Sequence, residues 1–210
     1  MLRFLKVIII QIKPGYFYLS NMQPLKLFMV LIGATPTGRH TEQHDVFFGI
    51  ADSLAGLLPA MKEFWPEAAD IMHIDAWREV TTIDGYQISV APRTTTARIQ
   101  GSKLFFINLG GYQYNKFEEQ HYYVLTVKEN RGSAFRQAKD TLFYQQNHIP
   151  GGTSHIDDKF GVDVDELFEI EDILLPSQKE LFQLELTPVA DLPEDELHLG
   201  YVKLSLLEQA

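Results

Sequence analysis

The chain contains no cysteine, so it can form neither a disulfide framework nor a thiolate nucleophile, and any metal site must use other ligands. Basic residues are also scarce: 18 Lys and Arg stand against 28 Asp and Glu, which gives a formal net charge of −10. Such a chain lacks the basic face that neutralises nucleic-acid phosphates, and anionic membranes repel it. We therefore expect neither a nucleic acid nor a membrane as partner. A reducing cytoplasmic location suits the absence of cysteine.

Long hydrophobic runs are missing as well. The most apolar stretch, residues 4–12, is interrupted by Lys6 and Gln11 and is shorter than the roughly 20 residues of a membrane span. A signal peptide needs small residues at its cleavage site, whereas residues 15–21 are rich in aromatic side chains. Residues 1–21 are then either a signal or anchor, or an upstream extension without a role. We favour the extension, with Met22 as the natural start.

What the chain does contain is an internal repeat. Residues 26–65 align with residues 103–142 without a gap, and eight of these 40 positions are identical. Average composition would give roughly one identity in fifteen. After five extra residues in the second copy, the triplet His73-Ile74-Asp75 aligns with His155-Ile156-Asp157. Two units of about 65 residues predict a pseudo-symmetric body, because solenoids contain more and shorter units.

Each copy predicts the order strand, long loop, strand, helix, strand, strand. The first strands, residues 26–32 and 103–109, are apolar runs typical of a strand buried on both faces. Gly33 and Gly110 are expected to end these strands, at a place where a positive φ is cheap.

The second strand resolves an ambiguity in the first copy. Residues 46–54 alone could belong to a helix, but the aligned residues 122–127 are rich in aromatic and β-branched side chains, which favour a strand. Since aligned copies should share a backbone, both segments are predicted to be strands.

The predicted helices begin and end at identifiable residues. In the first copy Pro59 is acceptable only in a first turn, so the helix should begin at Leu58 or Pro59 and end at Trp65. In the second copy the helix should follow an N-cap at Ser133 and run to Leu142.

The remaining strands complete each copy and extend the chain. The His-Ile-Asp triplets are placed on the third strands, and residues 86–90 and 167–171 are predicted to be the fourth strands. Residues 181–186 and 201–206 alternate in polarity and are expected to form a terminal hairpin that covers a sheet edge.

These elements predict an α+β protein in which two pseudo-symmetric ββαββ repeats form one compact body with a C-terminal β extension. The boundaries are 1–21 for the N-terminal extension, 22–92 for repeat 1, 103–175 for repeat 2 and 176–210 for the C-terminal strands. Residues 93–102 form a linking loop. Such a protein would be a monomer or a homodimer.

Two sets of histidines and carboxylates are retained in both copies: Glu42, His44, His73 and Asp75, and then Glu119, His121, His155 and Asp157. Residues two apart on a strand project to the same side, so the members of each set can meet. A histidine beside a carboxylate is the chemistry of a general base, or of a divalent metal site. The competing interpretation is structural: the groups satisfy buried backbone atoms where the two halves join.

The loop between the first two strands is longer than a usual hairpin loop, which favours a functional role. Arg39 and His40 could contact an anionic ligand there, although an ordinary surface loop is the favoured explanation. With Glu42 and Glu119 they are the candidate ligand-binding residues.

Several runs resemble a bacterial family catalogued as domain of unknown function 1543: residues 26–33, 38–48, 64–67, 73–80 and 154–159. The resemblance covers about residues 22–175. It implies one or two copies of a domain, in agreement with the repeat, and it implies no activity.

We expect a soluble protein that binds a small molecule or a protein partner in a pocket between its two repeats, because ligand sites often lie at such interfaces. The alternative is a small hydrolase-like enzyme that uses the His and carboxylate sets, with a divalent metal as its cofactor. No other cofactor is predicted.

Overall fold

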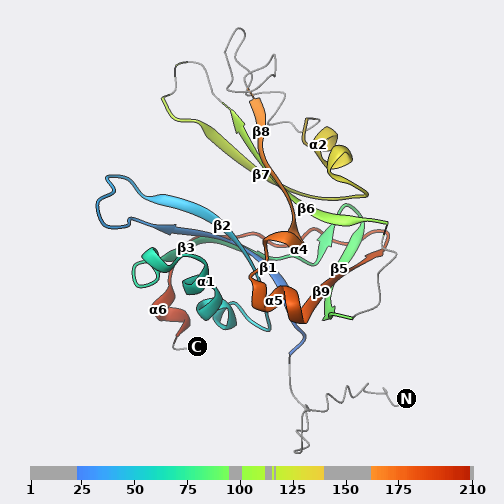
Figure 1. Ribbon diagram of the computed structural model, residues 1–210, viewed down its shortest axis with the longest axis horizontal. Coiled ribbons are helices and arrows are strands. Elements are labelled where there is room, and N and C mark those ends of the chain that lie inside the picture. Colours follow the sequence, from blue (N-terminus) through green and yellow to red (C-terminus); the bar gives the residue numbers. More distant parts are fainter. Residues whose placement is uncertain (1–22, 95–100, 112–114, 116, 140–161, 209–210) are drawn as a thin grey trace, which may run out of the picture.

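A computed structural model describes residues 23–94, 101–111, 115, 117–139 and 162–208. Within these residues three antiparallel sheets combine with a few short helices (Figure 1). The predicted α+β class is therefore confirmed.

The first sheet contains β1 (Lys26–Ala34), β2 (Gln43–Ala51), β3 (His73–Glu79) and β10 (His198–Lys203), in the order β10-β3-β1-β2. Helix α1 (Leu58–Phe64) lies on one face of this sheet and buries Met61 there. Its start and end agree with the positions predicted from Pro59 and Trp65. Two single 3-10 turns flank it, η1 (Ala55–Leu57) and η2 (Pro66–Ala68).

The second sheet repeats this arrangement with β6 (Lys103–Gly111), β7 (Gln120–Lys128) and β8 (Val162–Glu169), in the order β7-β6-β8. Its helix, α2 (Arg131–Lys139), packs Ala134 and Ala138 against one face of β6.

The cap of α2 differs from the sequence prediction. The side-chain oxygen of Asn130 accepts a hydrogen bond from the Ser133 N–H at 3.0 Å, so Asn130 is the cap and Ser133 lies inside the helix. Residues 140–142, where the predicted helix ended, lie outside the described residues. Gly33 and Gly110 also differ from expectation, because both lie within strands rather than after them.

The register of β8 corrects the alignment of the two copies. Gly33 lies opposite His73, whereas its counterpart Gly110 lies opposite Asp163. The position of His73 is thus taken in the second unit by Asp163, not by His155, which lies outside the described residues. The alignment of the triplets was wrong because it rests on only three matching residues that follow an insertion. The register of β8 is fixed instead by its pairing with β6, which has a β-bulge at the position equivalent to the bulge between β1 and β3.

The predicted fourth strand of the second copy is also wrong. Strand β8 runs to Glu169, and the chain then forms helix α4 (Ile170–Ile173). Residues 167–169 are therefore the end of the strand that pairs with β6.

The third sheet contains β4 (Thr82–Ile83), β5 (Tyr86–Pro92) and β9 (Phe182–Pro188), in the order β4-β5-β9. Asp84 and Gly85 join β4 to β5 with φ values of 50° and 76°, as a two-residue hairpin turn requires.

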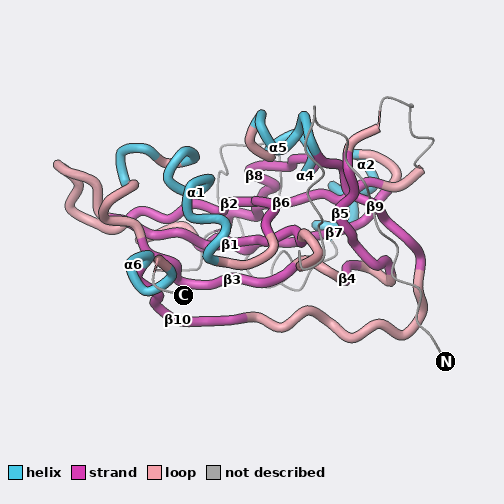
Figure 2. Tube along the Cα trace, turned by 90° about the horizontal axis from the view of Figure 1, so that it is seen from below, coloured by secondary structure: helices cyan, strands magenta, loops and turns pink. Residues whose placement is uncertain are grey.

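The C-terminal strands exist, but they do not form the predicted hairpin. Strand β9 pairs with β5, while β10 pairs with β3 in another sheet. The segment between them crosses the molecule to reach the edge of the first sheet (Figure 2). Asp195 fixes this segment, since its carboxylate accepts hydrogen bonds from the backbone N–H groups of Thr81 and Thr82 at 3.1 Å. The last helix, α6 (Leu204–Leu207), follows β10 directly.

A shared apolar layer lies between the first and second sheets. Alternate residues of each strand enter it, including Leu27 and Phe48 from one sheet and Phe106 and Val127 from the other. The rings of Phe48 and Phe106 meet edge to face with centroids 5.2 Å apart. Because the opposite faces of these sheets carry α1 and α2, the layers run helix, sheet, sheet, helix.

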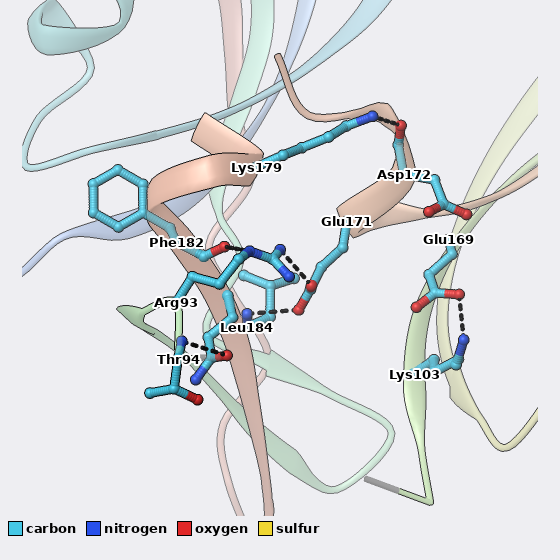
Figure 3. Close-up of polar contacts among 10 residues, drawn as sticks. Arg93, Thr94, Lys103, Glu169, Glu171, Asp172, Lys179, Phe182 and Leu184 are labelled. Carbon is cyan, nitrogen blue, oxygen red and sulfur yellow. Dashed lines mark hydrogen bonds and ion pairs between the residues drawn. The ribbon is translucent and has the colours of Figure 1, made fainter. Parts of the chain in front are cut away.

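Polar contacts attach the third sheet to this body. Glu171 on α4 accepts from Arg93 at 3.0 Å and from the Leu184 N–H of β9 at 2.8 Å (Figure 3). Helix α5 (Pro176–Leu181) contributes Gln178, whose side-chain amide exchanges two hydrogen bonds with the backbone of Ile50 on β2. Gln178 thus occupies part of an exposed strand edge.

The Asp84 carboxylate joins the two units. It accepts hydrogen bonds from the Thr126 hydroxyl at 2.6 Å and the Val127 N–H at 3.0 Å on β7. We expect Asp84→Asn to lower the free energy of unfolding by about 1–3 kcal/mol, because an amide loses these charge-assisted bonds while still tolerating the positive φ. Urea denaturation measures the loss.

Asp191→Asn is the matched control, since Asp191 is an exposed aspartate with a φ of 57°. An equal loss in both variants would contradict the assigned role and trace the effect to the turn conformation.

Candidate functional site

Three neighbouring strands bring the first predicted set together. On β1, Gly33 lies opposite His44 of β2 on one side and His73 of β3 on the other. A Cβ atom at Gly33 would lie only 2.6 Å from both His73 Nε2 and Asp75 Oδ2. The glycine is therefore needed for space, because its missing side chain leaves room for the histidines and the carboxylate.

Two carboxylates bridge two imidazoles in this histidine–carboxylate cluster, which consists of Glu42, His44, His73 and Asp75. His44 Nε2 lies 3.1 Å from Asp75 Oδ2 and 3.4 Å from Glu42 Oε2. His73 Nε2 lies 3.0 Å from Glu42 Oε1 and 3.3 Å from Asp75 Oδ1. The predicted meeting of these four side chains is therefore what the structure shows.

The cluster holds more acceptors than hydrogens. Each Nε2 carries at most one hydrogen, so the four N···O approaches cannot all be hydrogen bonds. Asp75 Oδ2 is buried and receives no hydrogen bond of good geometry, although His44 Nε2 lies 3.1 Å from it. A buried carboxylate oxygen that lacks a well-aligned donor is costly, so hydrogen bonds do not fully satisfy the cluster.

His73 is the fixed member of the cluster. Its side chain is only 6% exposed, and the Tyr201 ring of β10 stacks on it with centroids 4.3 Å apart. Glu42 and His44 are 44% and 40% exposed, so they are open to solvent. Tyr201 was missed by the sequence analysis because no local pattern links it to His73.

No three His, Asp or Glu side chains in the described part of the chain already form a set able to hold a metal ion. The four side chains of the cluster contact one another through ion pairs.

The second predicted set is assembled only in part. His121 lies on β7 opposite Gly110, the counterpart of His44, with its Nδ1 3.3 Å from Asn108 Oδ1. Glu119 directly precedes β7, as Glu42 precedes β2. His155 and Asp157 lie outside the described residues.

A cavity of about 690 Å³ opens between the first and second sheets, where a pocket between the repeats was expected. Both His44 and His121 line this seam pocket. Its lining combines apolar, polar and acidic side chains: Leu31, His44, Asp45, Val46, Phe106, Asn108, His121, Tyr123, Glu166 and Phe168.

The seam pocket has an acidic wall. Asp45 and Glu166 contribute carboxylates, and none of the described lining residues is a lysine or arginine. Partial burial raises the pKa of Asp45, a hydrogen bond from the Val46 N–H lowers it, and repulsion by Glu166 raises it further. Burial raises the pKa of Tyr123, and the charges of Asp45 and Glu166 raise it too, so its phenol stays neutral. Glu166 accepts a 2.6 Å hydrogen bond from Asn108.

Arg39 and His40, predicted to contact a ligand, are exposed in the loop between β1 and β2. The Arg39 N–H donates to the Pro36 carbonyl, and neither side chain lines the seam pocket. The acidic residues of the pocket were missed by the sequence analysis. Asn108 was the available signal, because it interrupts the apolar run of β6.

Residues 39–90 match the model of a family described as Domain of Unknown Function (DUF1543). The matched stretch contains all four residues of the histidine–carboxylate cluster, and it supports the resemblance seen in the sequence. A search of curated proteins gives no match. None of the described helices is long and apolar enough to cross a membrane.

The chain is also similar in fold to the crystal structure of a protein Il1583 from Idiomarina loihiensis. The TM-score is 0.56 at 20% sequence identity, over 86% of this chain and 98% of that one. At this identity the likeness concerns the fold alone.

Gly33→Ala tests whether the cluster depends on the missing side chain. The added methyl group must displace Asp75 or the buried His73, so we expect the free energy of unfolding to fall by about 1–3 kcal/mol in urea titrations. Gly101→Ala is the control, because a Cβ there meets nothing within 4 Å. Equal stability of the two variants would mean that the Asp75 and His73 side chains can move aside without a loss of stability.

The Asp45 carboxyl predicts a pH dependence. A raised folded-state pKa means that ionisation of Asp45 lowers stability as the pH rises above its ordinary value of about 3.9. Asp45→Asn should therefore be more stable than the wild type at pH 8, with a gain that shrinks towards pH 4 in denaturant titrations. Glu63→Gln, at an exposed carboxylate on α1, should show no such trend, and a pH-independent gain in Asp45→Asn would refute the explanation.

Proposed function

We propose that the protein binds a small organic molecule in the seam pocket, and that this molecule joins a positive charge to an apolar body. The observation that carries the proposal is a pocket between the two sheets with an acidic wall and no basic lining residue among those described. Its volume of about 690 Å³ lies within the range of small-molecule sites, roughly 300–1,000 Å³.

The charge of the ligand follows from the wall. Burial is the main cause of the raised pKa of Asp45, and repulsion by the Glu166 carboxylate adds to it. An ammonium group placed between them would replace repulsion by attraction, whereas a carboxylate would add to the repulsion. Anionic ligands are accordingly disfavoured.

The apolar body follows from the remaining lining. Leu31, Val46 and Phe106 extend the shared apolar layer into the pocket, and Phe168 is partly exposed beside them. Aromatic faces also attract cations, so Phe168 and the neutral Tyr123 suit the same ligand.

The alternative function is that of a hydrolase-like enzyme. His44 lines the pocket and lies 3.1 Å from Asp75, which resembles a general base with its orienting partner. In that case His44→Gln would abolish turnover of a bound molecule while leaving its affinity nearly unchanged. Binding is the better-supported function, because the acidic and apolar lining of the pocket already defines a class of ligand, whereas no feature of the pocket defines a reaction.

A thermal-shift panel of benzylamine, benzyl alcohol and benzoate tests the binding proposal, since these probes share a size and differ in charge. Ligand at ten times its Kd stabilises by about 1.4 kcal/mol. For a chain of this length that is a rise in Tm of roughly 3–6 °C. We expect the rise for amines only.

Asp45→Asn and Glu166→Gln should each reduce the shift, while Glu63→Gln on α1 should preserve it. A larger shift with benzoate, or an undiminished shift in both pocket variants, would overturn the proposal.

A further inference from the structure

The histidine–carboxylate cluster has the donor chemistry of a metal site. Glu42, His44, His73 and Asp75 offer two imidazole nitrogens and two carboxylates from three adjoining segments of the first sheet. Mixed nitrogen and oxygen ligands suit borderline first-row cations such as Zn²⁺, whereas Ca²⁺ and Mg²⁺ prefer oxygen alone.

The spacing of these donors agrees with that chemistry. Donor atoms about 2.0–2.1 Å from a tetrahedral ion lie roughly 3.3 Å from one another, since a tetrahedron's edge is about 1.6 times its centre-to-corner distance. The four N···O distances in the cluster are 3.1, 3.4, 3.0 and 3.3 Å, so each nitrogen lies at this spacing from one oxygen of each carboxylate. Each carboxylate approaches the two histidines with different oxygens, so it must turn to bring one oxygen to a shared ion.

A cation could also bind the nitrogen and oxygen lone pairs that hydrogen bonds within the cluster leave unsatisfied. Deprotonated Nε2 atoms and both carboxylates could all direct lone pairs to one positive ion, which would satisfy the buried Asp75 Oδ2 where no aligned hydrogen bond does. The same ion would offset the repulsion between the two carboxylates.

The surroundings provide both rigidity and access. His73 is buried beneath Tyr201, and Gly33 keeps the space beside its Nε2 clear. As the described side chains stand, no three of them are placed to hold an ion. The half-exposed side chains of Glu42 and His44 can make the remaining adjustment by rotation, because they are the least packed members.

We propose that Glu42, His44, His73 and Asp75 bind one divalent transition-metal ion of the Zn²⁺ type. The set of two histidines is not repeated in the described part of the second unit, since the position opposite Gly110 is Asp163 instead of a histidine. One ion per chain is therefore expected. The proposal does not depend on the organic ligand of the seam pocket, with which it shares only His44.

Isothermal titration of the metal-free full-length chain with ZnCl₂, without any organic ligand, tests this site. We expect one Zn²⁺ per chain, and Co²⁺ should bind competitively and give a visible absorption spectrum from nitrogen and oxygen ligation. Loss of an outer-shell partner alone weakens metal sites by about 10–100-fold, so loss of a ligand in Glu42→Gln or His44→Gln should weaken binding by at least about 100-fold.

Both variants change half-exposed residues, so we expect them to fold, whereas His73→Ala would remove a buried side chain and could unfold the protein. Circular dichroism checks that the variants are folded. His198→Gln is the matched control, because His198 stacks on Trp77 outside the cluster. Absence of Zn²⁺ binding in the wild type overturns the proposal, and so does binding that is unchanged in the Glu42→Gln/His44→Gln double variant. The amine panel repeated with EDTA reports on the seam pocket alone, so either proposal can fail without the other.

Discussion

The apolar layer between the first two sheets is the contact on which the rest of the structure depends. Side chains from β1, β2, β6 and β7 meet there, and each sheet can carry a helix on its outer face only because its inner face is covered. Towards the ends of the hairpins the large apolar residues give way to glycine, histidine and acidic residues. The layer therefore opens into the seam pocket at the point where its apolar side chains run out.

The C-terminal segment adds strands to two sheets that begin in the first unit. Strand β10 covers the free edge of β3 and places Tyr201 on His73, while β9 extends β5. Glu171 and Asp195 fix the connections by accepting backbone hydrogen bonds. A cluster built from residues 42–75 thus owes its burial to residues more than a hundred positions later in the chain.

Local pattern was sufficient for much of the fold. The strand assignment of residues 46–54 followed from aromatic residues in the aligned copy and is correct as far as Ala51, where β2 ends. Pro59 located the start of α1. The shared direction of His73 and Asp75, and of Glu42 and His44, was predictable because side chains two apart on a strand share a face. The meeting of the two pairs depends on β1, which places Gly33 between them. The place of His73 in the second unit was not predictable from three matching letters, since pairing with β6 decides the register.

Contacts between distant segments escaped prediction for a physical reason. Tyr201 reaches His73 through the path of a long connection, and Asp45 approaches Glu166 only after two sheets have packed. Neither relation leaves a periodic trace in the sequence. The repeat predicted a pocket between the copies, but nothing in the sequence indicated that acidic residues would lie there.

Gly33 gives a criterion for sorting related chains. Four matching His, Asp and Glu residues would be a misleading sign of a shared site wherever a bulkier residue occupies this position, because the space between the imidazoles would then be filled. The absence of one methyl group is as much a part of the site as the four side chains themselves.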